Sequence, residues 1–512
     1  MGEFIAMPQI RRRKLALMDT VVIRWIILSL AALSLAPAEI SIALAMPLPD
    51  KQMSPVSSPV RVSIDVRAKP LSKFLGLGVE FDPYQFPPAP DRWQAILDRV
   101  AYARFGFFRV MSGANDYCLG FGTSGEPIYV WDHPDATAEQ RLSRVLAILD
   151  FAQKNKIDVY LGEWSPPRGL GITSPDDPRW PRIIADFVQY LVAKKHYSVV
   201  GHYIFFNEPN GVWMWPHSAP DYSAWSKGIR RLRQELDRRD LKNVLLAGPD
   251  NSGDKDWFAA SVHDLAPQFG AWESHIYATD AEVYGGLIES SLTQATATVL
   301  SGDPNGTSKV RFIAESGLQD GKDEATDQQP RVRTFPYGVI MADYVSQVAR
   351  AGWMGANAWD LDDAMHGNRQ RGPKVWGFWD SSPSSDMANR PWFYTWSLIS
   401  RYFPRGSSIR KVNVSPSADR FRATAATWAS AKGGEVSILL VNDDDIARTV
   451  IVDQLPRGSG KLYCYHYFDS DRPVAATGLP KPADVLMPTR FTKGLTISMP
   501  SRGVVLLTTA GQ

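Results

Sequence analysis

The sequence predicts an α/β protein, a (β/α)8 TIM barrel followed by a C-terminal β-sandwich domain. From residue 74 to 403, short apolar runs alternate with longer segments whose apolar residues recur every three or four positions. This alternation is typical of buried parallel strands joined by helices. After residue 403 the helical period disappears, and short segments separated by turn residues follow. Such segments are typical of an all-β domain of about 100 residues.

Eight apolar runs predict the strands of the barrel: 74–81, 107–111, 158–164, 202–208, 243–250, 271–277, 310–316 and 355–361. The clearest helical patterns between them cover 138–156, 180–196, 222–241 and 334–352. Eight such units predict a closed barrel. An open doubly wound sheet is the alternative, but the glycine-rich phosphate turn expected after its first strand is missing.

The N-terminus has the pattern of an export signal. Basic residues 11–14 precede an apolar run at 26–36, and Ala-Leu-Ala at 43–45 offers a cleavage site. A retained membrane anchor is the alternative, but Pro37 and Glu39 interrupt the apolar run before it reaches the roughly 20 residues that a spanning helix needs. We therefore expect a secreted or periplasmic protein with no stable membrane association after cleavage.

The run VRVSIDVRA at 60–68 resembles the C-terminal strands in character, although it precedes the barrel. We expect it to cross over and to add a strand to the sandwich. The predicted organisation is a signal peptide (1–45), a linker (46–59), the N-terminal strand (60–73), the catalytic barrel (74–403) and the β-sandwich (404–512).

Composition narrows the class of partner. The net charge of the 512 residues is only +2, so nucleic acid is not expected as a partner. The 17 Trp and 18 Tyr residues favour partly open aromatic surfaces, on which the C–H faces of carbohydrates stack. Cys118 and Cys464 are interpreted as free thiols rather than a disulfide, and no residue spacing predicts a metal or redox site. No cofactor is expected, and no motif defines an oligomeric state.

In a barrel of this kind the active site lies at the C-terminal ends of the strands. Glu208 in FFNEP and Glu315 in FIAES each end an apolar strand, the fourth and the seventh, on opposite sides of the mouth. Two facing carboxylic acids are what glycosidic bond cleavage requires. The alternative for each is a structural carboxylate paired with an arginine. The polar residues at the other strand ends include Glu80, Asp82, Arg109, Glu163, Asn207, Asp250, His275, Tyr277 and Trp359.

These residues carry a resemblance to a known group of enzymes. NEPN at 207–210 and Glu315 resemble the signature of the clan A glycoside hydrolases over about residues 74–403. NEPN and AGPD at 247–250 look most like family 39, while WSPP at 164–167 is similar to a segment of family 30. The trailing sandwich is similar to that of both families.

The resemblance implies roles for five residues. Glu208 would be the general acid/base, and Glu315 the nucleophile that forms a glycosyl-enzyme. Asn207 would hydrogen-bond the sugar 2-hydroxyl. Arg109 would keep Glu315 ionised by charge proximity, and Tyr277 would hydrogen-bond the same carboxylate.

Aromatic residues and one histidine complete the predicted substrate-binding set. Trp359 would form the floor beneath the sugar, and Trp164 belongs to the segment similar to family 30. Trp213 and Trp215 either stack on neighbouring sugars or pack their loop against the barrel rim. His275 either lines the pocket or is a hydrogen-bonded core histidine.

The predicted function is a retaining β-glycoside hydrolase that cleaves β-linked poly- or oligosaccharide by double displacement, with carbohydrate as its partner. An exo-acting β-xylosidase or β-glucosidase and a transglycosylase are alternatives, because the same two glutamates serve them. A non-catalytic glycan-binding protein is the alternative outside the enzymes. Retention predicts carboxyl groups about 5–5.5 Å apart.

Overall fold

The structure is a computed structural model that describes residues 58–511 except 134–135, 216–217, 431–432, 454–460 and 488–493. The predicted signal peptide and all but the last two linker residues lie outside the described residues. Within the described part of the chain, no helix has both the length and the apolar character needed to cross a membrane.

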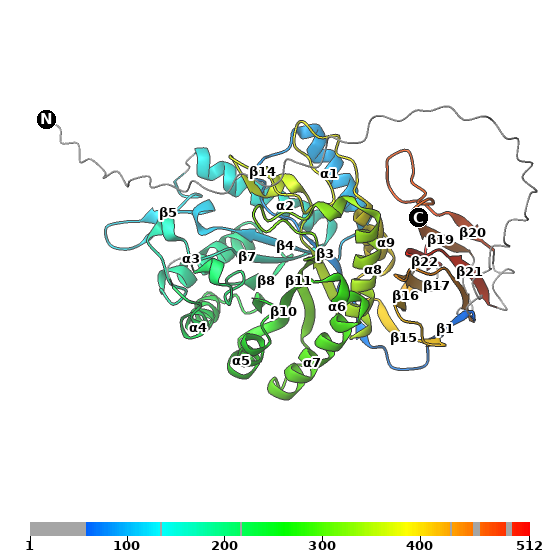
Figure 1. Ribbon diagram of the computed structural model, residues 1–512. Coiled ribbons are helices and arrows are strands. Elements are labelled where there is room, and N and C mark those ends of the chain that lie inside the picture. Colours follow the sequence, from blue (N-terminus) through cyan, green and yellow to red (C-terminus); the bar gives the residue numbers. More distant parts are fainter. Residues whose placement is uncertain are drawn as a thin grey trace, which may run out of the picture. The chain divides into compact units, whose positions relative to one another are not determined.

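Eight parallel strands close into a barrel, with each strand bonded to the next in chain order and the last bonded to the first (Figure 1). They are β3 (Gly76–Glu80), β4 (Phe107–Ser112), β7 (Asp158–Glu163), β8 (Val200–Ile204), β9 (Leu245–Ser252), β10 (Phe269–Ala278), β11 (Val310–Leu318) and β12 (Gly355–Ala358). The predicted TIM barrel is confirmed, and the open sheet is excluded. The prediction for β8 was wrong at its end, because the strand stops at Ile204 and not at residue 208.

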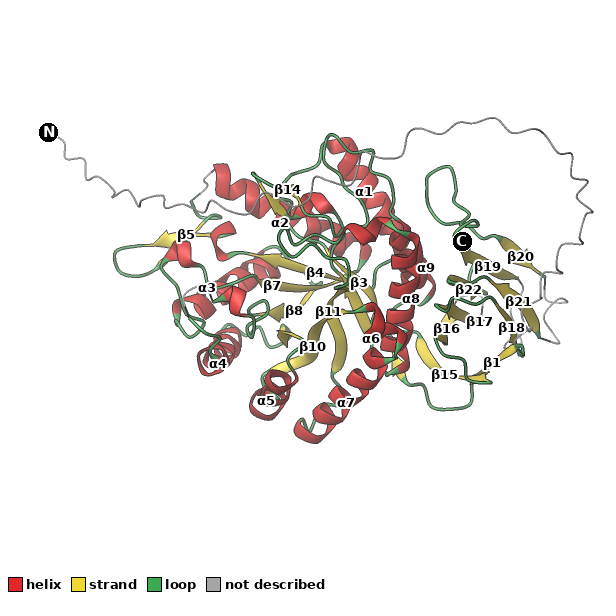
Figure 2. Cartoon of the chain, viewed as in Figure 1, coloured by secondary structure: helices red, strands yellow, loops and turns green. Residues whose placement is uncertain are grey.

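Helices surround the barrel strands and bury their outward side chains (Figure 2). They are α1 (Pro90–Ala103), α2 (Ala136–Asn155), α3 (Arg179–Gln189), α4 (Tyr222–Arg238), α5 (Lys255–Leu265), α6 (Asp280–Tyr284), α7 (Leu287–Gly302), α8 (Phe335–Arg350) and α9 (Pro391–Tyr402). Proline in the first turn favours the start of α1, α8 and α9. Asp221 and Asp254 cap α4 and α5 by accepting backbone N–H groups of the first turn.

The interior of the barrel below the mouth is filled with apolar side chains. Phe107, Tyr160, Ile204 and Phe312 are fully buried there, from four different strands. Aromatic rings of this layer contact one another, as in the 5.2 Å centroid distance between Phe107 and Phe312. The barrel is therefore a packed core, and the strand ends above this layer have a rigid base.

The C-terminal region forms one continuous sheet folded into two layers, in the order β20-β19-β22-β17-β16-β15-β1-β18-β21. These strands are β1 (Val60–Asp65), β15 (Ser408–Ser415), β16 (Phe421–Ser430), β17 (Gly433–Asn442), β18 (Arg448–Val452), β19 (Leu462–Tyr467), β20 (Asp484–Leu486), β21 (Leu495–Met499) and β22 (Gly503–Thr508). The first residues of β15 pair with β16 and its later residues pair with β1, so β15 passes from one layer to the other. The run at 60–68 thus supplies β1 to this sheet.

Short strands complete the described sheets: β2 (Ser72–Lys73), β5 (Cys118–Phe121), β6 (Pro127–Tyr129), β13 (Gly367–Asn368) and β14 (Gly372–Pro373). β2 pairs with β15, whereas β5 pairs with β6 and β13 with β14. The two cysteines, one on β5 and one on β19, are free and buried, as predicted.

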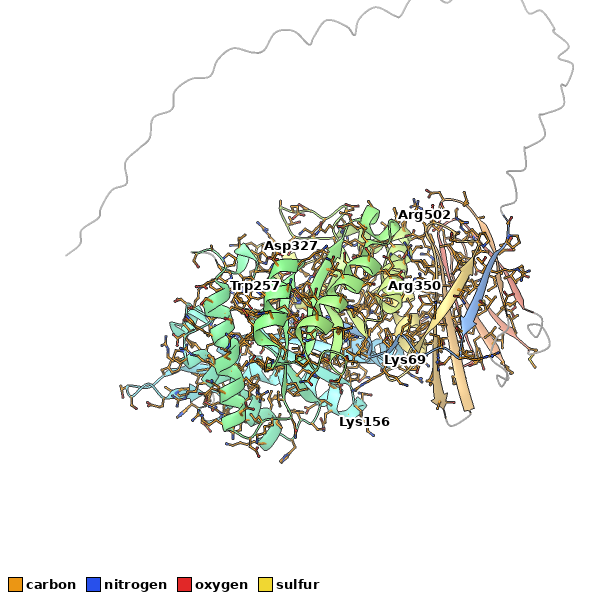
Figure 3. All side chains as sticks on the ribbon, turned by 90° about the horizontal axis from the view of Figure 1, so that it is seen from below. Lys69, Lys156, Trp257, Asp327, Arg350 and Arg502 are labelled. Atoms are coloured by element: carbon orange, nitrogen blue, oxygen red, sulfur yellow. The ribbon has the colours of Figure 1, made fainter. Side chains whose placement is uncertain are left out.

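β17 is buried on both faces, which explains its continuous apolar sequence. Ile438 and Leu440 point into the core between the two layers, while Leu439 and Val441 belong to the core shared with the barrel. An ion pair from Arg422 of β16 to the buried Asp343 of α8 ties the same surfaces together. In Figure 3, the label of Arg350 marks the end of α8 in the barrel, and the label of Arg502 marks the turn before β22 in the sandwich. The sandwich therefore braces the barrel.

Candidate active site

Arg109 is the centre of the buried network at the barrel mouth. It lies on β4 and is fully buried. Its Nη1 donates to both carboxylate oxygens of Glu80, at 2.9 and 3.0 Å, and to Oε1 of Glu315 at 2.8 Å. Its Nη2 donates to Asn207 Oδ1 and to Asp250 Oδ2, each at 2.8 Å. One guanidinium thus aligns polar side chains from several strand ends.

Glu315 lies on β11 and is held by three neighbours. Besides Arg109, Tyr277 donates its hydroxyl to Oε2 of Glu315 at 2.7 Å, and the Nδ1 atom of His275 lies 3.5 Å from the same oxygen. The predicted contacts of Arg109 and Tyr277 with this carboxylate are therefore present in the structure. Together they fix the orientation of the carboxylate, as an attacking oxygen requires.

Glu208 lies in a loop that follows β8 rather than on the strand itself. Its φ of 45° places the backbone in the left-handed region, which costs a residue other than glycine on the order of 1–3 kcal/mol. Backbone bonds hold this conformation: the N–H of Glu208 donates to the Asp250 carbonyl at 2.9 Å, and the N–H of Asn207 donates to the Glu163 carbonyl at 3.1 Å. The left-handed residue turns the chain at the mouth, four residues after the end of β8.

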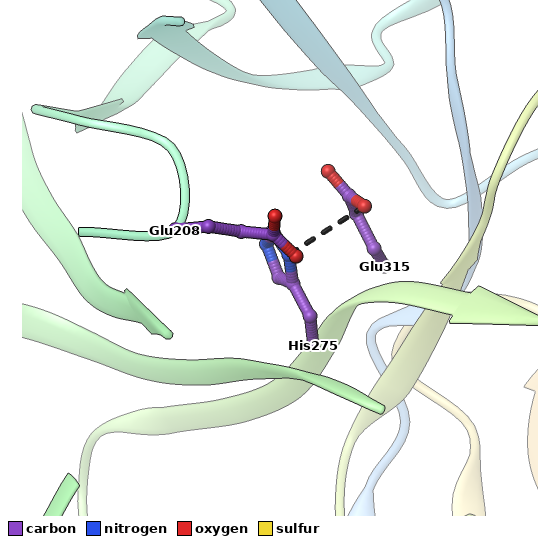
Figure 4. A group of neighbouring side chains, drawn as sticks. All are labelled: Glu208, His275 and Glu315. Atoms are coloured by element: carbon purple, nitrogen blue, oxygen red, sulfur yellow. Dashed lines mark hydrogen bonds and ion pairs between the residues drawn. The ribbon is translucent and has the colours of Figure 1, made fainter. Parts of the chain in front are cut away.

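Two side chains donate to the Glu208 carboxylate. Nδ1 of His275 lies 3.1 Å from Oε1, and the indole N–H of Trp213 donates to Oε2 at 2.7 Å. The other ring nitrogen of His275, Nε2, lies 3.0 Å from Oδ1 of Asp250. Figure 4 shows Glu208, His275 and Glu315 converging at the mouth. One oxygen of each carboxylate and a ring nitrogen of His275 lie within 4.8 Å of one another.

His275 carries a positive charge in this setting. Burial acts to lower the pKa of His275, but the carboxylates of Glu315 and Asp250 outweigh burial, so its pKa lies well above the ordinary value. The imidazolium then donates from both ring nitrogens. His275 combines the two predicted alternatives. It is a buried, hydrogen-bonded histidine, only 1% exposed, and it also contacts both glutamates of the pocket. It acts on the carboxylates and is not an open sugar-binding surface.

The pKa directions of the two glutamates differ from those implied by the resemblance. Burial acts to raise the pKa of Glu208, but the bonds from His275 and Trp213 outweigh it and lower the pKa. Burial is also the largest influence on Glu315, and it raises the pKa of that group despite the opposing effects of His275 and Arg109. Arg109 therefore favours the ionised form of Glu315 as expected, but does not determine the net direction. Glu208 needs a change in its hydrogen bonds before it can act as an acid.

The predicted aromatic residues fall into two groups. Trp359 packs against Trp164, with ring centroids 5.8 Å apart, and both rings contact His366. Trp213 is 60% exposed at the mouth, on a 3-10 turn at 212–214. Of the two alternatives for Trp215, the structure agrees with packing of the loop and not with substrate contact, because the ring is buried against Phe206 and its indole donates to the Pro209 carbonyl at 2.8 Å.

Four residues at the mouth were not among the predicted catalytic or substrate-binding residues. Glu80 and Asp250 are the outer partners of Arg109, and Asp82 and His366 lie beside Trp164. The position of Glu80 and Asp82 at the end of an apolar strand was the available signal. The sequence signal near His366 is the unusual length of the loop after β12, at residues 360–390, because such long loops are often functional.

Asn207 was predicted to bind a sugar hydroxyl. Its Oδ1 accepts from Arg109, and among the described residues nothing accepts from its Nδ2. The amide is thereby oriented with its NH2 group, which carries two N–H donors, left over.

Two groups of side chains have ligand atoms close enough for a metal ion, namely Glu208, His275 and Glu315, and Asp250, Glu273 and His275. The guanidinium of Arg109 and the charged imidazole of His275 make both groups poor cation sites.

Neither a family model nor a curated protein matches the sequence. Solved structures do match, and the fold they share with this chain is that of glycoside hydrolases of families 30, 39 and 51. The predicted resemblance to clan A is thus confirmed at the level of the fold.

Three of these structures show the extent of the match. A GH30 endoxylanase from Clostridium papyrosolvens C71 is 11% identical, with a TM-score of 0.61 over 88% of this chain and 99% of that one. A GH39 enzyme from Xanthomonas axonopodis pv. citri is 14% identical, with a TM-score of 0.59 over 90% and 99%. AbfB, a family 51 alpha-L-arabinofuranosidase from Bifidobacterium longum, is 14% identical, with a TM-score of 0.61 over 89% and 100%.

Proposed function

We propose that this chain is an exported, retaining glycoside hydrolase that cleaves β-linked poly- or oligosaccharide with Glu208 and Glu315. The observation that carries the proposal is the approach of the two carboxylates, with one oxygen of each and a nitrogen of His275 within 4.8 Å. Retaining enzymes have carboxyl groups about 5–5.5 Å apart, whereas inverting enzymes need about 6.5–9.5 Å to admit a water. The fold shared with glycosidases supports the same reaction class.

In the first step, an oxygen of Glu315 attacks the anomeric carbon while the bond to the leaving oxygen breaks. Glu208 gives its proton to that oxygen, so the leaving sugar departs as an alcohol. Arg109 and Tyr277 hold the attacking carboxylate in place. Before this step Glu208 must take up a proton, and the exposed Trp213 is the partner that a leaving group at the mouth can displace.

In the second step, Glu208 removes a proton from water, and the resulting hydroxide equivalent displaces Glu315 from the anomeric carbon. Glu315 has lost its charge in the ester, so the repulsion between the two carboxylates, which raises the pKa of Glu315 in the free enzyme, is absent. The bonds from His275 and Trp213 then stabilise Glu208 as the base. The resting hydrogen bonds of Glu208 thus suit the second step better than the first.

The first experiment compares wild type with Glu208→Gln and Glu315→Gln on a panel of β-linked polysaccharides and aryl glycosides. We expect reducing ends from wild type, with loss of several orders of magnitude in Glu315→Gln, because an amide of the same shape cannot attack. Proton NMR of the first product should show the β-anomer. Release of the α-anomer would overturn retention, and full activity of Glu315→Gln would overturn the nucleophile.

Mass analysis of the same products separates hydrolysis from transfer. Products longer than the substrate would show that a sugar and not water takes the glycosyl group. Binding of a glycan by wild type without any product would support a binding protein instead. Single sugars as the first products would indicate exo cleavage.

A further inference from the structure

A cavity of about 330 Å³ lies beside Trp164. Its walls come from the ends of β3, β4 and β7, from α2, and from the loop after β12. Glu208 and its partners come from the opposite sector, after β8 and on β9 and β10. Since Glu208 serves the leaving group, this cavity lies on the side of the sugar that stays on the enzyme. Its volume is at the lower end of the range of about 300–1,000 Å³ that is typical for small-molecule sites.

Two buried polar atoms at this cavity have no hydrogen-bond partner among the described residues. Asp82 is 1% exposed; its Oδ1 accepts the N–H of Met111, but its Oδ2 accepts nothing. Nε2 of His366 lies 3.3 Å from that oxygen without a hydrogen bond between them, and is also unpartnered. Buried polar groups normally have partners; these two atoms lie at ion-pair distance from each other, and each keeps the capacity for a further hydrogen bond. An acceptor and a ring nitrogen beside an indole suit the hydroxyls and the C–H face of a sugar.

Two arginines form the outer wall of the same cavity. Arg141 and Arg144 lie one helical turn apart on α2 and both line the space. Nη1 of Arg144 donates to the Tyr84 carbonyl at 2.9 Å, and the described residues place no carboxylate within ion-pair distance of either guanidinium. Asp116 shares the cavity, and both arginines act to lower its pKa, although its Oδ2 accepts the N–H of Gly113 and neither guanidinium is in ion-pair contact with it. Two guanidinium groups on one helix face, neither in contact with a carboxylate, suit a further carboxylate.

We propose that this cavity binds a uronic acid residue of the glycan, next to the sugar that is cleaved and on its non-leaving side. Asp82 and His366 take the ring hydroxyls, and Arg141 and Arg144 take the carboxylate. The inference rests on the proposed function and deepens it, because it names an acidic glycan as the substrate class. It also places at least one sugar beyond the cleaved residue on the non-leaving side, so we do not expect single sugars as the first products.

The test is the binding of uronate oligosaccharides to the Glu315→Gln variant by calorimetry, each compared with the same oligosaccharide after reduction of its carboxyl to an alcohol. The probes are glucuronic acid-branched xylo-oligosaccharides, oligogalacturonates and oligomannuronates. We expect one of these to bind roughly 10- to 100-fold more tightly than its reduced form, as hydrogen bonds to a charged group predict. The difference should shrink at high salt.

Substitutions locate the effect. Adding Arg141→Gln and Arg144→Gln should remove the preference for the acid, while Arg238→Gln, at an exposed position on α4, should leave it unchanged. Adding Asp82→Asn, which keeps an acceptor for the N–H of Met111, should weaken the binding of the acidic oligosaccharide and of its reduced form by the same factor. Unchanged melting temperatures would exclude misfolding as the cause.

The outcomes separate this inference from the proposed function. Equal binding of acid and reduced forms, or no binding of any uronate by an enzyme that hydrolyses neutral glycans, overturns the uronate site alone. An arginine-dependent preference in a protein whose wild type hydrolyses nothing overturns the proposed function alone. If the protein shows neither uronate binding nor hydrolysis, both the uronate site and the proposed function are overturned.

Discussion

The indole N–H of Trp213 donates to Oε2 of Glu208 at 2.7 Å, and the indole ring is 60% exposed. An exposed ring on a short 3-10 turn therefore stabilises the ionised form of the carboxylate that we propose as the general acid. The bond is available to be broken by a ligand, because most of Trp213 is exposed. Trp213 thus couples occupancy of the mouth to the proton affinity of Glu208.

We expect Trp213→Phe to shift the basic limb of the kcat/KM profile to higher pH. The variant loses the N–H that lowers the pKa of Glu208, so the pKa rises. The acid must be protonated to act, and activity falls as the pH rises through that pKa; a higher pKa therefore moves the fall to higher pH. Trp257→Phe is the matched control, since its indole N–H has no partner among the described residues (Figure 3). A limb that stays in place or moves to lower pH would contradict this account.

We expect His275→Gln to reduce kcat/KM roughly 100-fold or more, as the loss of a donor to a reacting oxygen does. The imidazolium lies 3.1 Å from Glu208 and 3.5 Å from Glu315 and lowers the pKa of both. Without it both pKa values rise. The acid limb should then move to higher pH, because Glu315 must be ionised to attack.

Rate profiles of His275→Gln against those of His263→Gln, a histidine exposed on α5, check this expectation. An unchanged acid limb would show that His275 does not set the charge of the nucleophile. A loss of melting temperature without a change in the profile would assign it a structural role only.

The barrel and the two glutamates could be predicted because both follow from local pattern. Apolar strands bounded by turns identify the eight units, and the carboxyl ends of parallel strands necessarily meet at one edge. Glu208, Glu315, Arg109 and Tyr277 therefore come together in any closed arrangement of those strands. The alternation places these residues at one edge, and their roles follow from the resemblance of the NEPN motif and Glu315 to clan A.

What could not be predicted depends on atomic packing. Trp213 and Trp215 are two residues apart, yet one is exposed and the other is buried under the Pro209 carbonyl, because the 3-10 turn faces them in different directions. His366 reaches Asp82 only through the fold of the loop after β12, a contact across 284 positions in the chain. The local spacing of apolar residues carries no information about the burial of these tryptophans or about the contact between His366 and Asp82.

We expect Arg109→Lys to destabilise the protein by about 3–5 kcal/mol, the usual cost of breaking a buried ion pair. The guanidinium is fully buried and bonds to Glu80, Glu315, Asn207 and Asp250 from a planar fork. A lysine ammonium is a point charge and cannot reach all four, so carboxylates are left unpaired. Urea unfolding measures the change. Arg238→Lys, in an exposed pair with Glu235, should change little; equal midpoints for the two variants would contradict the network.

We expect Val62→Ala to lower the stability of the protein by about 1.5–3 kcal/mol, because its fully buried side chain fills the core between the sandwich layers. Val62 pairs with Val414 of β15 on one side and with Val452 of β18 on the other. Its neighbour Arg61 is the control on the same strand, since its side chain is 59% exposed and Arg61→Ala should change little.

The same variant tests whether the sandwich braces the barrel. Leu439 and Val441 of β17 share a core with the barrel, and Arg422 pairs with Asp343 of α8. A single transition that moves to lower temperature in Val62→Ala, with activity lost at the same temperature, is the result we expect. Two separate transitions, with activity surviving the first, would show that the barrel is stable without the sandwich, and β1 would then matter only to its own sheet.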